Sequence, residues 1–163
     1  MKNKLYLHIG ANKTGSSAVQ EFLSKNRLAL EAQGYCYPKL GEIYHAHYGI
    51  SSAFGCGPNG PRVEPVELNA LTEKLLEECG NKDCIVSSEY FITLKNASAV
   101  IDKLSKSFDL EIIVYFRRHD LWYESLYNQA VKTAINPPWG KGIQAYLNYQ
   151  WKKGSQTFDY LNI

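Results

Sequence analysis

Two glycines, a lysine and three small hydroxyl residues lie together near the start of the chain, in the run Gly10-Ala11-Asn12-Lys13-Thr14-Gly15-Ser16-Ser17. Glycine lets an anion approach the backbone closely, lysine supplies a mobile positive charge, and hydroxyl groups supply hydrogen-bond donors. If the run joins a strand to the N-terminus of a helix, its backbone N–H groups point at one spot. The run therefore predicts a cradle for a phosphate or a similar anion.

The order of these residues differs from that of the nucleotide-triphosphate P-loop, G-x-x-x-x-G-K-[ST]. Gly10 and Gly15 have the P-loop separation, but Ser16 follows Gly15 and the lysine comes earlier, at Lys13. The order K-T-G-S-S after a first strand resembles the 5′-phosphosulfate-binding loop of sulfotransferases that use 3′-phosphoadenosine 5′-phosphosulfate (PAPS), and the bacterial, carbohydrate-type branch most of all. An ordinary strand-to-helix turn that binds nothing is the alternative.

A second pair of residues matches the same family farther along the chain. In these sulfotransferases an arginine at the end of a strand and a serine eight residues later hold the 3′-phosphate of PAPS, and Arg117 and Ser125 have this spacing. The alternative is that Arg117 and Arg118 only pair with Asp120 or Glu124. The resemblance implies the following cofactor-binding residues: Lys13, Thr14, Gly15, Ser16, Ser17, Arg117 and Ser125.

Sulfuryl transfer needs a base that takes the acceptor's proton and a cation that stabilises charge on the leaving phosphate. The family places a histidine or glutamate just beyond the second core strand, where this chain has Glu89. The resemblance thus implies Glu89 as the base and Lys13 as the catalytic cation, with no metal. His45 and His47 are the reserve candidates for the base. A solvated or ion-paired loop carboxylate is the alternative for Glu89.

Alternating strands and helices would bring these groups together. Apolar runs predict strands at residues 4–9, 84–86 and 111–116, and each strand leads into one of the polar clusters. Helical periodicity predicts helices at 16–32, 65–79, 97–107, from a cap at Asp120 to just before Asn136, and at 143–151. The first helix is expected to bury Val19, Phe22, Leu23 and Leu30. We expect a three-layer, P-loop-like α/β domain with a central parallel sheet flanked by helices.

Residues 35–65 are rich in glycine and proline and are the least regular part of the chain. We expect this insertion to lie over the ligand edge of the sheet as an acceptor-binding segment, with a short helix at Tyr44–Tyr48; a surface loop is the alternative. The whole chain, 1–163, is expected to form a single sulfotransferase-like domain. It stops at Ile163, so the C-terminal part of the family fold is expected to be missing.

Composition narrows the class of protein. Of 163 residues, 45% are hydrophobic and 21% charged, which is typical of a globular domain. A net charge of +2 is too mild to predict a nucleic-acid partner. Four cysteines without a CxxC or Cys/His cluster argue against zinc. With no apolar run of membrane-spanning length and no signal peptide, we expect a cytoplasmic protein with free thiols.

The predicted function is transfer of a sulfuryl group from PAPS to a hydroxyl or amine of a small-molecule or glycan acceptor. Two other functions stay open. One is a small-molecule or nucleotide kinase with a degenerate P-loop, but a kinase needs Mg²⁺ held by a P-loop hydroxyl and an acid at a strand end. Here the G-K-[ST] order is broken, and the second strand leads into Ser87-Ser88-Glu89 without an aspartate. The other is a non-catalytic nucleotide-binding remnant.

Overall fold

The computed structural model describes residues 2–57, 65–94 and 97–154, and the chain divides into two compact units, Met1–Tyr115 and Phe116–Ile163. Each unit is described by itself. The first contains, in order, β1 (Lys4–His8), α1 (Ser16–Lys25), α2 (Arg27–Ala32), β2 (Tyr35–Cys36), α3 (Tyr48–Ala53), α4 (Pro65–Cys79), β3 (Asp83–Ser87), the 3₁₀ helix η1 (Glu89–Thr93), α5 (Ala97–Ser107) and β4 (Asp109–Ile113). The second contains α6 (His119–Thr133) and α7 (Ile143–Lys152). The single domain over 1–163 stays a prediction.

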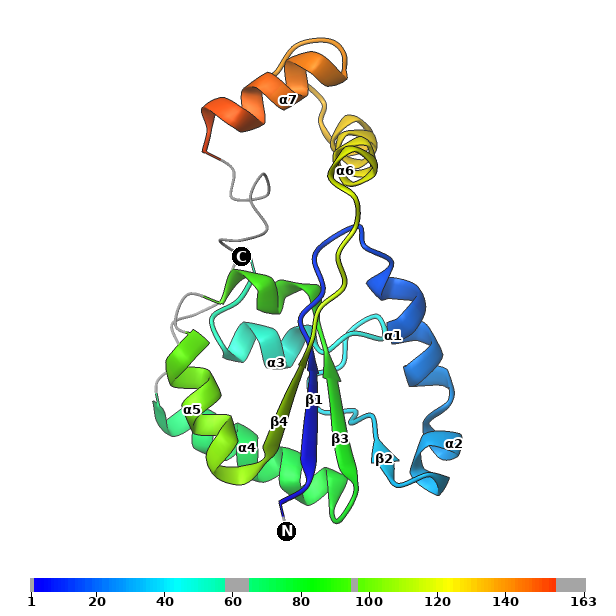
Figure 1. The fold of residues 1–163 in the computed structure, drawn as a ribbon, viewed down its shortest axis with the longest axis vertical. Coiled ribbons are helices and arrows are strands. Elements are labelled where there is room, and N and C mark those ends of the chain that lie inside the picture. The colour runs from blue at the N-terminus through cyan, green and yellow to red at the C-terminus, as the bar shows by residue number, and fades with distance from the viewer. Residues whose placement is uncertain (1, 58–64, 95–96, 155–163) are drawn as a thin grey trace. The chain divides into compact units, whose positions relative to one another are not determined.

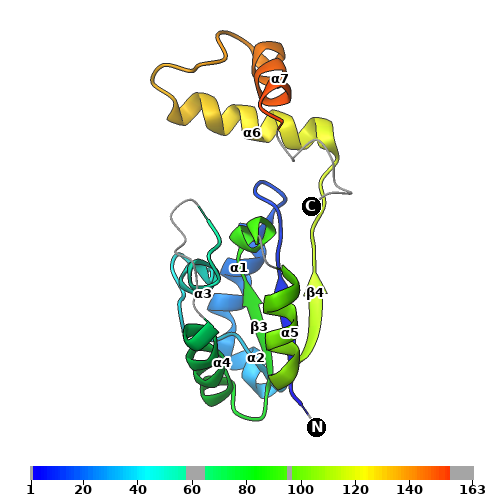
Figure 2. The same cartoon turned by 90° about the vertical axis from the view of Figure 1, so that its left-hand side faces the viewer.

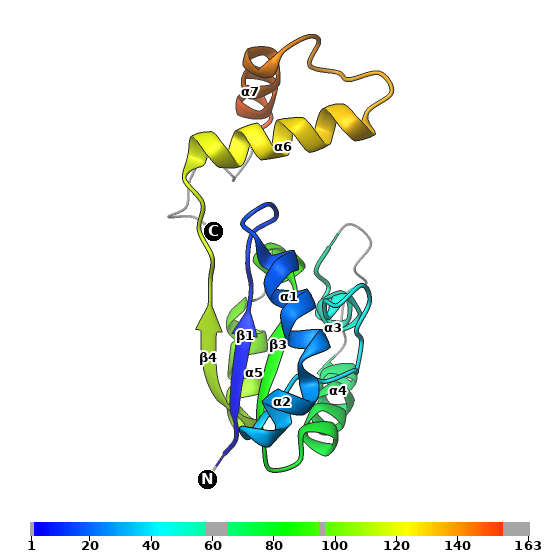
Figure 3. The ribbon, with the colours of Figure 1, turned by 90° about the vertical axis from the view of Figure 1, so that its right-hand side faces the viewer.

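The first unit is built on a parallel sheet with the strand order β2-β3-β1-β4 (Figure 1). The central strand β1 pairs with β3, where His8 lies opposite Ser87, and with β4, where His8 lies opposite Ile113. Helices α1 and α2 cover one face of the sheet, and α4 and α5 cover the other, as the two side views show (Figures 2 and 3). The predicted three-layer α/β fold with a central parallel sheet is confirmed.

The two faces of the sheet differ in chemistry. Successive side chains of a strand point to opposite faces. One set packs with α4 and α5 into the apolar core, whose most buried members include Leu5, Leu7, Cys84, Val86, Leu75 and Leu104. Fully burying one such side chain stabilises the fold by about 1.5–3 kcal/mol. The other set, towards α1, ends in the buried polar residues His8 and Ser87. A polar cluster thus lies at the carboxyl edge of the sheet under α1.

The predicted helix at 16–32 is two helices, α1 and α2, because the chain breaks at Asn26, whose φ is −106° and ψ 25°. The expectation that Phe22 is buried is wrong, since its side chain is 62% exposed. The buried residues of α1 are instead Ser16 and Gln20. The helix turns a polar stripe inward because the sheet beneath it ends in polar groups.

The bounds predicted for α4 and α5 are confirmed, and those for α7 differ by one residue. The strand predicted at 111–116 begins and ends earlier, because β4 is Asp109–Ile113. The Ile113 carbonyl accepts the last hydrogen bond of the ladder, from the N–H of Ile9, so Val114 and the residues after it lie beyond the sheet. The prediction that Asp120 caps α6 is wrong. Arg118 holds that position, and Asp120 lies in the first turn.

The insertion is more ordered than predicted. Its first two residues form β2, which was not predicted from the sequence. The prediction of a helix at Tyr44–Tyr48 is wrong, because Tyr44 and His45 have φ values of 51° and 70°. These two residues form a turn that is closed by hydrogen bonds between Ile43 and Ala46. The helix α3 begins only at Tyr48. Residues 58–64 of the insertion and the tail 155–163 lie outside the described residues.

Within the described residues, no helix combines the length and apolar character that crossing a bilayer requires.

Candidate functional site

The loop between β1 and α1 holds the predicted anion-binding residues in an unusual backbone turn. Lys13 lies in the left-handed region with φ 66°, and Gly15, the N-cap of α1, has φ 97°. Thr14 closes the turn by donating its hydroxyl to the carbonyl of Ala11 at 2.7 Å. A left-handed conformation is strained for a residue other than glycine, and residues with such backbone strain are frequent at ligand sites. The first turn of α1 carries no acidic residue, so its positive end suits an external anion.

The two serines that open α1 differ in exposure. Ser16 is buried, whereas Ser17 is exposed. Lys13 and Gly15 are also exposed, and Thr14 is half-buried. The loop therefore presents the lysine, the backbone at Gly15 and the Ser17 hydroxyl towards solvent, and the buried Ser16 packs beneath them.

Glu89 begins η1 and is separated from the end of β3 by one residue, Ser88. Because β3 runs parallel to β1, Glu89 and the loop that follows β1 lie at the same edge of the sheet. Two donors hold its carboxylate. The Tyr48 hydroxyl donates to Oε1 at 2.6 Å, and the Gln20 amide donates to Oε2 at 3.1 Å. Burial, and then the hydrogen bond to Glu89, raise the pKa of Tyr48, so Tyr48 stays protonated and continues to donate. The carboxylate is thereby fixed in orientation by α1 on one side and α3 on the other.

Ser87 connects this carboxylate to the interior. The Gln20 nitrogen that binds Glu89 also donates to the Ser87 hydroxyl at 3.2 Å, and Ser87 Oγ lies 2.7 Å from Nδ1 of His8. The Ser87 backbone bonds to His47 in both directions: the N–H donates to His47 Nδ1, and the carbonyl accepts from His47 N–H. Residues from β1, α1 and the insertion thus meet at the last residue of β3.

The two reserve histidines have different surroundings. Both ring nitrogens of the buried His47 are engaged, because Nδ1 accepts from Ser87 N–H and Nε2 lies 2.8 Å from the Pro38 carbonyl. His47 therefore cannot take a proton from an acceptor without losing the bond to β3. His45 lies in the turn before α3 with Nδ1 3.0 Å from the Ser24 hydroxyl. Neither is hydrogen-bonded to Glu89 in the described structure.

Burial, the largest effect, lowers the pKa of His47, although its bonds to Pro38 and Ser87 and the nearby Glu42 act in the opposite direction. Below about pH 6.5, His47 therefore binds a proton in the unfolded chain but not in the folded chain. The contribution of His47 to stability is fully present above that pH and declines below it. Between the ordinary pKa of histidine and the lowered pKa of His47 in the folded chain, we expect acidification to reduce the free energy of unfolding, by at most about 1.4 kcal/mol per pH unit. Urea unfolding at about pH 7.5 and about pH 5.5 measures the change.

His47→Gln should unfold with a shallower pH dependence than the wild type, because glutamine does not titrate. His45→Gln, which removes an exposed histidine two residues away, is the matched control for the loss of an imidazole. Equal dependence in His47→Gln and the wild type would show that the buried imidazole is not the source.

His8 belongs to this cluster and was not among the residues selected from the sequence. Its side chain is 3% exposed, and its Nε2 atom has no hydrogen-bond partner within the described part of the chain. Burial lowers the pKa of His8, and Glu89 partly offsets that effect. A polar residue in the last position of β1, two residues before Gly10, was the signal that could have identified it.

Arg117 and Ser125 lie in the second unit. Arg117 comes four residues after the end of β4, so the prediction that it ends the strand directly is wrong; Ser125 falls on the second turn of α6, as predicted. The neighbouring Arg118 forms a two-bond pair with the carboxylate of Asp120, at 2.6 and 2.7 Å. Whether Arg117 and Ser125 act together with the loop of the first unit stays a prediction.

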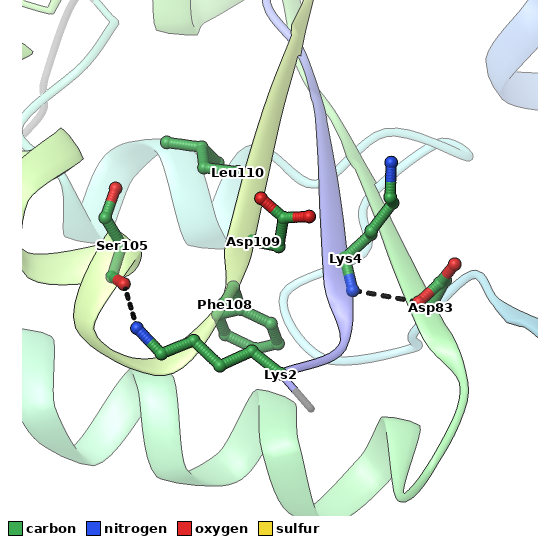
Figure 4. A pocket seen from close by; sticks show the side chains of 7 residues that line it. All are labelled: Lys2, Lys4, Asp83, Ser105, Phe108, Asp109 and Leu110. Carbon is green, nitrogen blue, oxygen red and sulfur yellow. Dashed lines mark hydrogen bonds between the residues drawn. The ribbon is translucent and has the colours of Figure 1, made fainter.

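A hollow at the opposite edge of the sheet lies where β1, β3 and β4 begin (Figure 4). Its polar lining is occupied by contacts within the chain: Lys2 donates to the Ser105 carbonyl at 2.6 Å, and the Lys4 N–H donates to Asp83 at 2.8 Å. It is lined by Lys2, Lys4, Asp83, Ser105, Phe108, Asp109 and Leu110. None of the predicted site residues lies there.

Among the described residues, no group of three or more His, Cys, Asp or Glu side chains is arranged so that it could hold a metal ion.

Comparison with known proteins identifies no function. No family model matches the chain, and no solved structure matches it. A segment of 71 residues is 41% identical to a protein of Archaeoglobus fulgidus that bears the name "Uncharacterized protein". That similarity covers 42% of this chain and 19% of the archaeal protein.

Proposed function

We propose that the protein transfers a sulfuryl group from PAPS to a hydroxyl of a small-molecule or glycan acceptor. The observation that carries the proposal is the pairing of two groups at one sheet edge: the turn of Lys13 and Gly15 at the start of α1, and the Glu89 carboxylate fixed by α1 through Gln20. The first suits the anionic donor and the second suits the acceptor's proton. The order K-T-G-S-S supports the phosphosulfate in particular.

Each residue has a role in the proposed transfer. Lys13, Ser17 and the backbone at Gly15 hold the phosphosulfate, and Glu89 takes the proton of the acceptor hydroxyl. The acceptor oxygen bonds to sulfur as the bond from sulfur to the bridging phosphate oxygen breaks, and adenosine 3′,5′-bisphosphate leaves. Lys13 stabilises the charge that develops on this leaving group. Tyr48 and Gln20 position the carboxylate.

Two further observations support the proposed acceptor and the proposed compartment. The insertion supplies Tyr48 beside Glu89, and the ring of Tyr90 lies 4.9 Å from that of Tyr48, so aromatic faces suited to a sugar lie next to the proposed base. All four cysteines are buried free thiols, which supports a reducing compartment such as the cytoplasm.

Adenosine 3′,5′-bisphosphate is expected to bind more tightly than 5′-AMP, and Mg²⁺ is not expected to be needed. An additional charge-assisted phosphate contact is worth about 1.5–3 kcal/mol, or roughly 10- to 100-fold in affinity. Calorimetric titration of both nucleotides, with Mg²⁺ and with EDTA, measures this. Preference for ADP or ATP with a strict metal requirement would favour the kinase, and bisphosphate binding without any transfer from PAPS would favour the non-catalytic remnant.

Arg117→Ala is expected to weaken the bisphosphate about 10- to 100-fold while leaving 5′-AMP nearly unchanged, because an arginine fork binds phosphate with two hydrogen bonds. Calorimetric titration of the variant with both nucleotides measures these affinities. Arg118→Ala is the matched control, since this neighbouring guanidinium is exposed and pairs with Asp120. An equal loss for both nucleotides would show that Arg117 does not read the 3′-phosphate.

A further inference from the structure

The unpartnered nitrogen of His8 is a buried feature of the polar cluster that the proposed transfer does not use. Its ring is fixed, because Nδ1 lies 2.7 Å from Ser87 Oγ and the ring packs 4.8 Å from that of Tyr115. Nε2 is buried and has no hydrogen-bond partner in the described structure. Buried polar groups of this kind are uncommon in native proteins and call for a reason.

The neighbouring hydrogen bonds are compatible with a proton on Nε2. Gln20 donates to the Glu89 carboxylate, and the same nitrogen donates to Ser87 Oγ. Ser87 can then direct its own hydrogen to Nδ1 of His8, which lies 2.7 Å away. In this tautomer the imidazole proton is on Nε2, so the unpartnered atom is a donor that lacks an acceptor.

Nε2 faces the anion loop. A Cβ atom built on Gly10, the first glycine of the loop, would lie 2.9 Å from Nε2 and 3.6 Å from Cβ of Ser16, the first residue of α1. Nε2 therefore packs against the backbone of Gly10, next to the start of the helix. Because residue 10 has no side chain, none separates Nε2 from the backbone of the loop.

We propose that His8 is a binding residue of the loop, whose Nε2–H donates to an oxygen of a tetrahedral oxyanion seated at residues 10–17. The positive end of α1 favours negative charge, and the buried donor beside Gly10 lacks an acceptor. The assignment of that oxyanion to the phosphosulfate of PAPS rests on the proposed function. The donor itself needs only a phosphate or sulfate group.

Two isosteric variants separate the ring nitrogens. In His8→Asn the side-chain amide can replace Nδ1 and keep the bond to Ser87, but nothing replaces Nε2–H. In His8→Gln the amide reaches the position of Nε2 and restores a donor there. We expect His8→Asn to bind inorganic pyrophosphate and adenosine 3′,5′-bisphosphate at least tenfold more weakly than the wild type, and His8→Gln to recover most of the loss.

Calorimetric titration of the full chain with each probe measures these affinities. A second measurement needs no variant: in wild-type protein labelled with ¹⁵N at histidine, the His8 Nε2–H signal should shift when pyrophosphate is added, while that of His47 stays in place. Unchanged affinity in His8→Asn, or an unmoved His8 signal with the probe bound, overturns the proposal. Binding of neither probe by the wild type overturns it as well.

The proposed function fails separately from this inference. If His8→Asn weakens pyrophosphate but the wild type does not prefer adenosine 3′,5′-bisphosphate to pyrophosphate, His8 remains an oxyanion donor and the assignment to PAPS is wrong. If the bisphosphate binds tightly and His8→Asn binds it as the wild type does, the nucleotide site stands without His8.

Discussion

Glu89→Gln is expected to lower the rate of sulfuryl transfer about 10²–10⁴-fold, the usual contribution of a general base. Glutamine keeps the size of the side chain and can still accept from Tyr48, but it cannot take the proton of the acceptor hydroxyl. Affinity for adenosine 3′,5′-bisphosphate should stay near the wild-type value. The measurement is transfer from radiolabelled PAPS to the mono- or oligosaccharide that the wild type sulfates, together with calorimetric binding.

The matched control for this variant is Glu21→Gln, which also removes one carboxylate. Glu21 lies on α1 one residue from Gln20, but its side chain is half-exposed and pairs with Lys25. It should transfer sulfate at the wild-type rate. Wild-type turnover in Glu89→Gln would instead assign the base to another group at the same edge.

Lys13→Asn is expected to lower transfer about 10²–10³-fold, the typical cost of removing one group that stabilises charge in a transition state. Asparagine is the appropriate replacement because it tolerates the left-handed backbone that Lys13 adopts at φ 66°. The charge is therefore removed without the strain that other residues would add. The transfer assay used for Glu89 measures the effect, and bisphosphate binding should weaken as well.

Lys25→Asn, in the last turn of α1, is the corresponding control, because it also removes one positive charge but lies at the opposite end of the helix from the loop. A loop that serves only as a turn between strand and helix would make the two lysine variants equivalent. Equal transfer rates in both would therefore contradict the role of Lys13.

The apolar framework of the first unit was largely predictable. In α4 and α5 the apolar residues recur at helical spacing, and Gly80 after α4 adopts the φ of 60° that ends many helices, so the expected and observed bounds agree. The two residues of β2 are too few to show any period. For β4, the apolar run continues to Phe116, but the end of the strand depends on where its partner β1 ends, which no local pattern contains.

The polar cluster was less predictable, for a physical reason. The anion loop and Glu89 could be identified because residue type and order at strand ends carry chemical meaning. The partners of Glu89 could not, because Gln20 lies 69 residues away and Tyr48 lies 41 residues away in the sequence. Periodicity placed Phe22 inward since it assumes an apolar partner beneath the helix, whereas Gln20 meets the hydroxyl of Ser87. Only the tertiary structure shows what each face covers.

The position of β1 also has a consequence for how the chain assembles during synthesis. His8 bonds to Ser87, 79 residues later, and Lys4 pairs with Glu111, 107 residues later. Closing such long loops costs chain entropy before any sheet contact offsets it. The central strand β1 is therefore made before both of its neighbours in the sheet and stays unpaired until they have been made. Until then Leu5 and Leu7 remain uncovered, and exposed apolar side chains of this kind make a partly synthesised chain prone to aggregation.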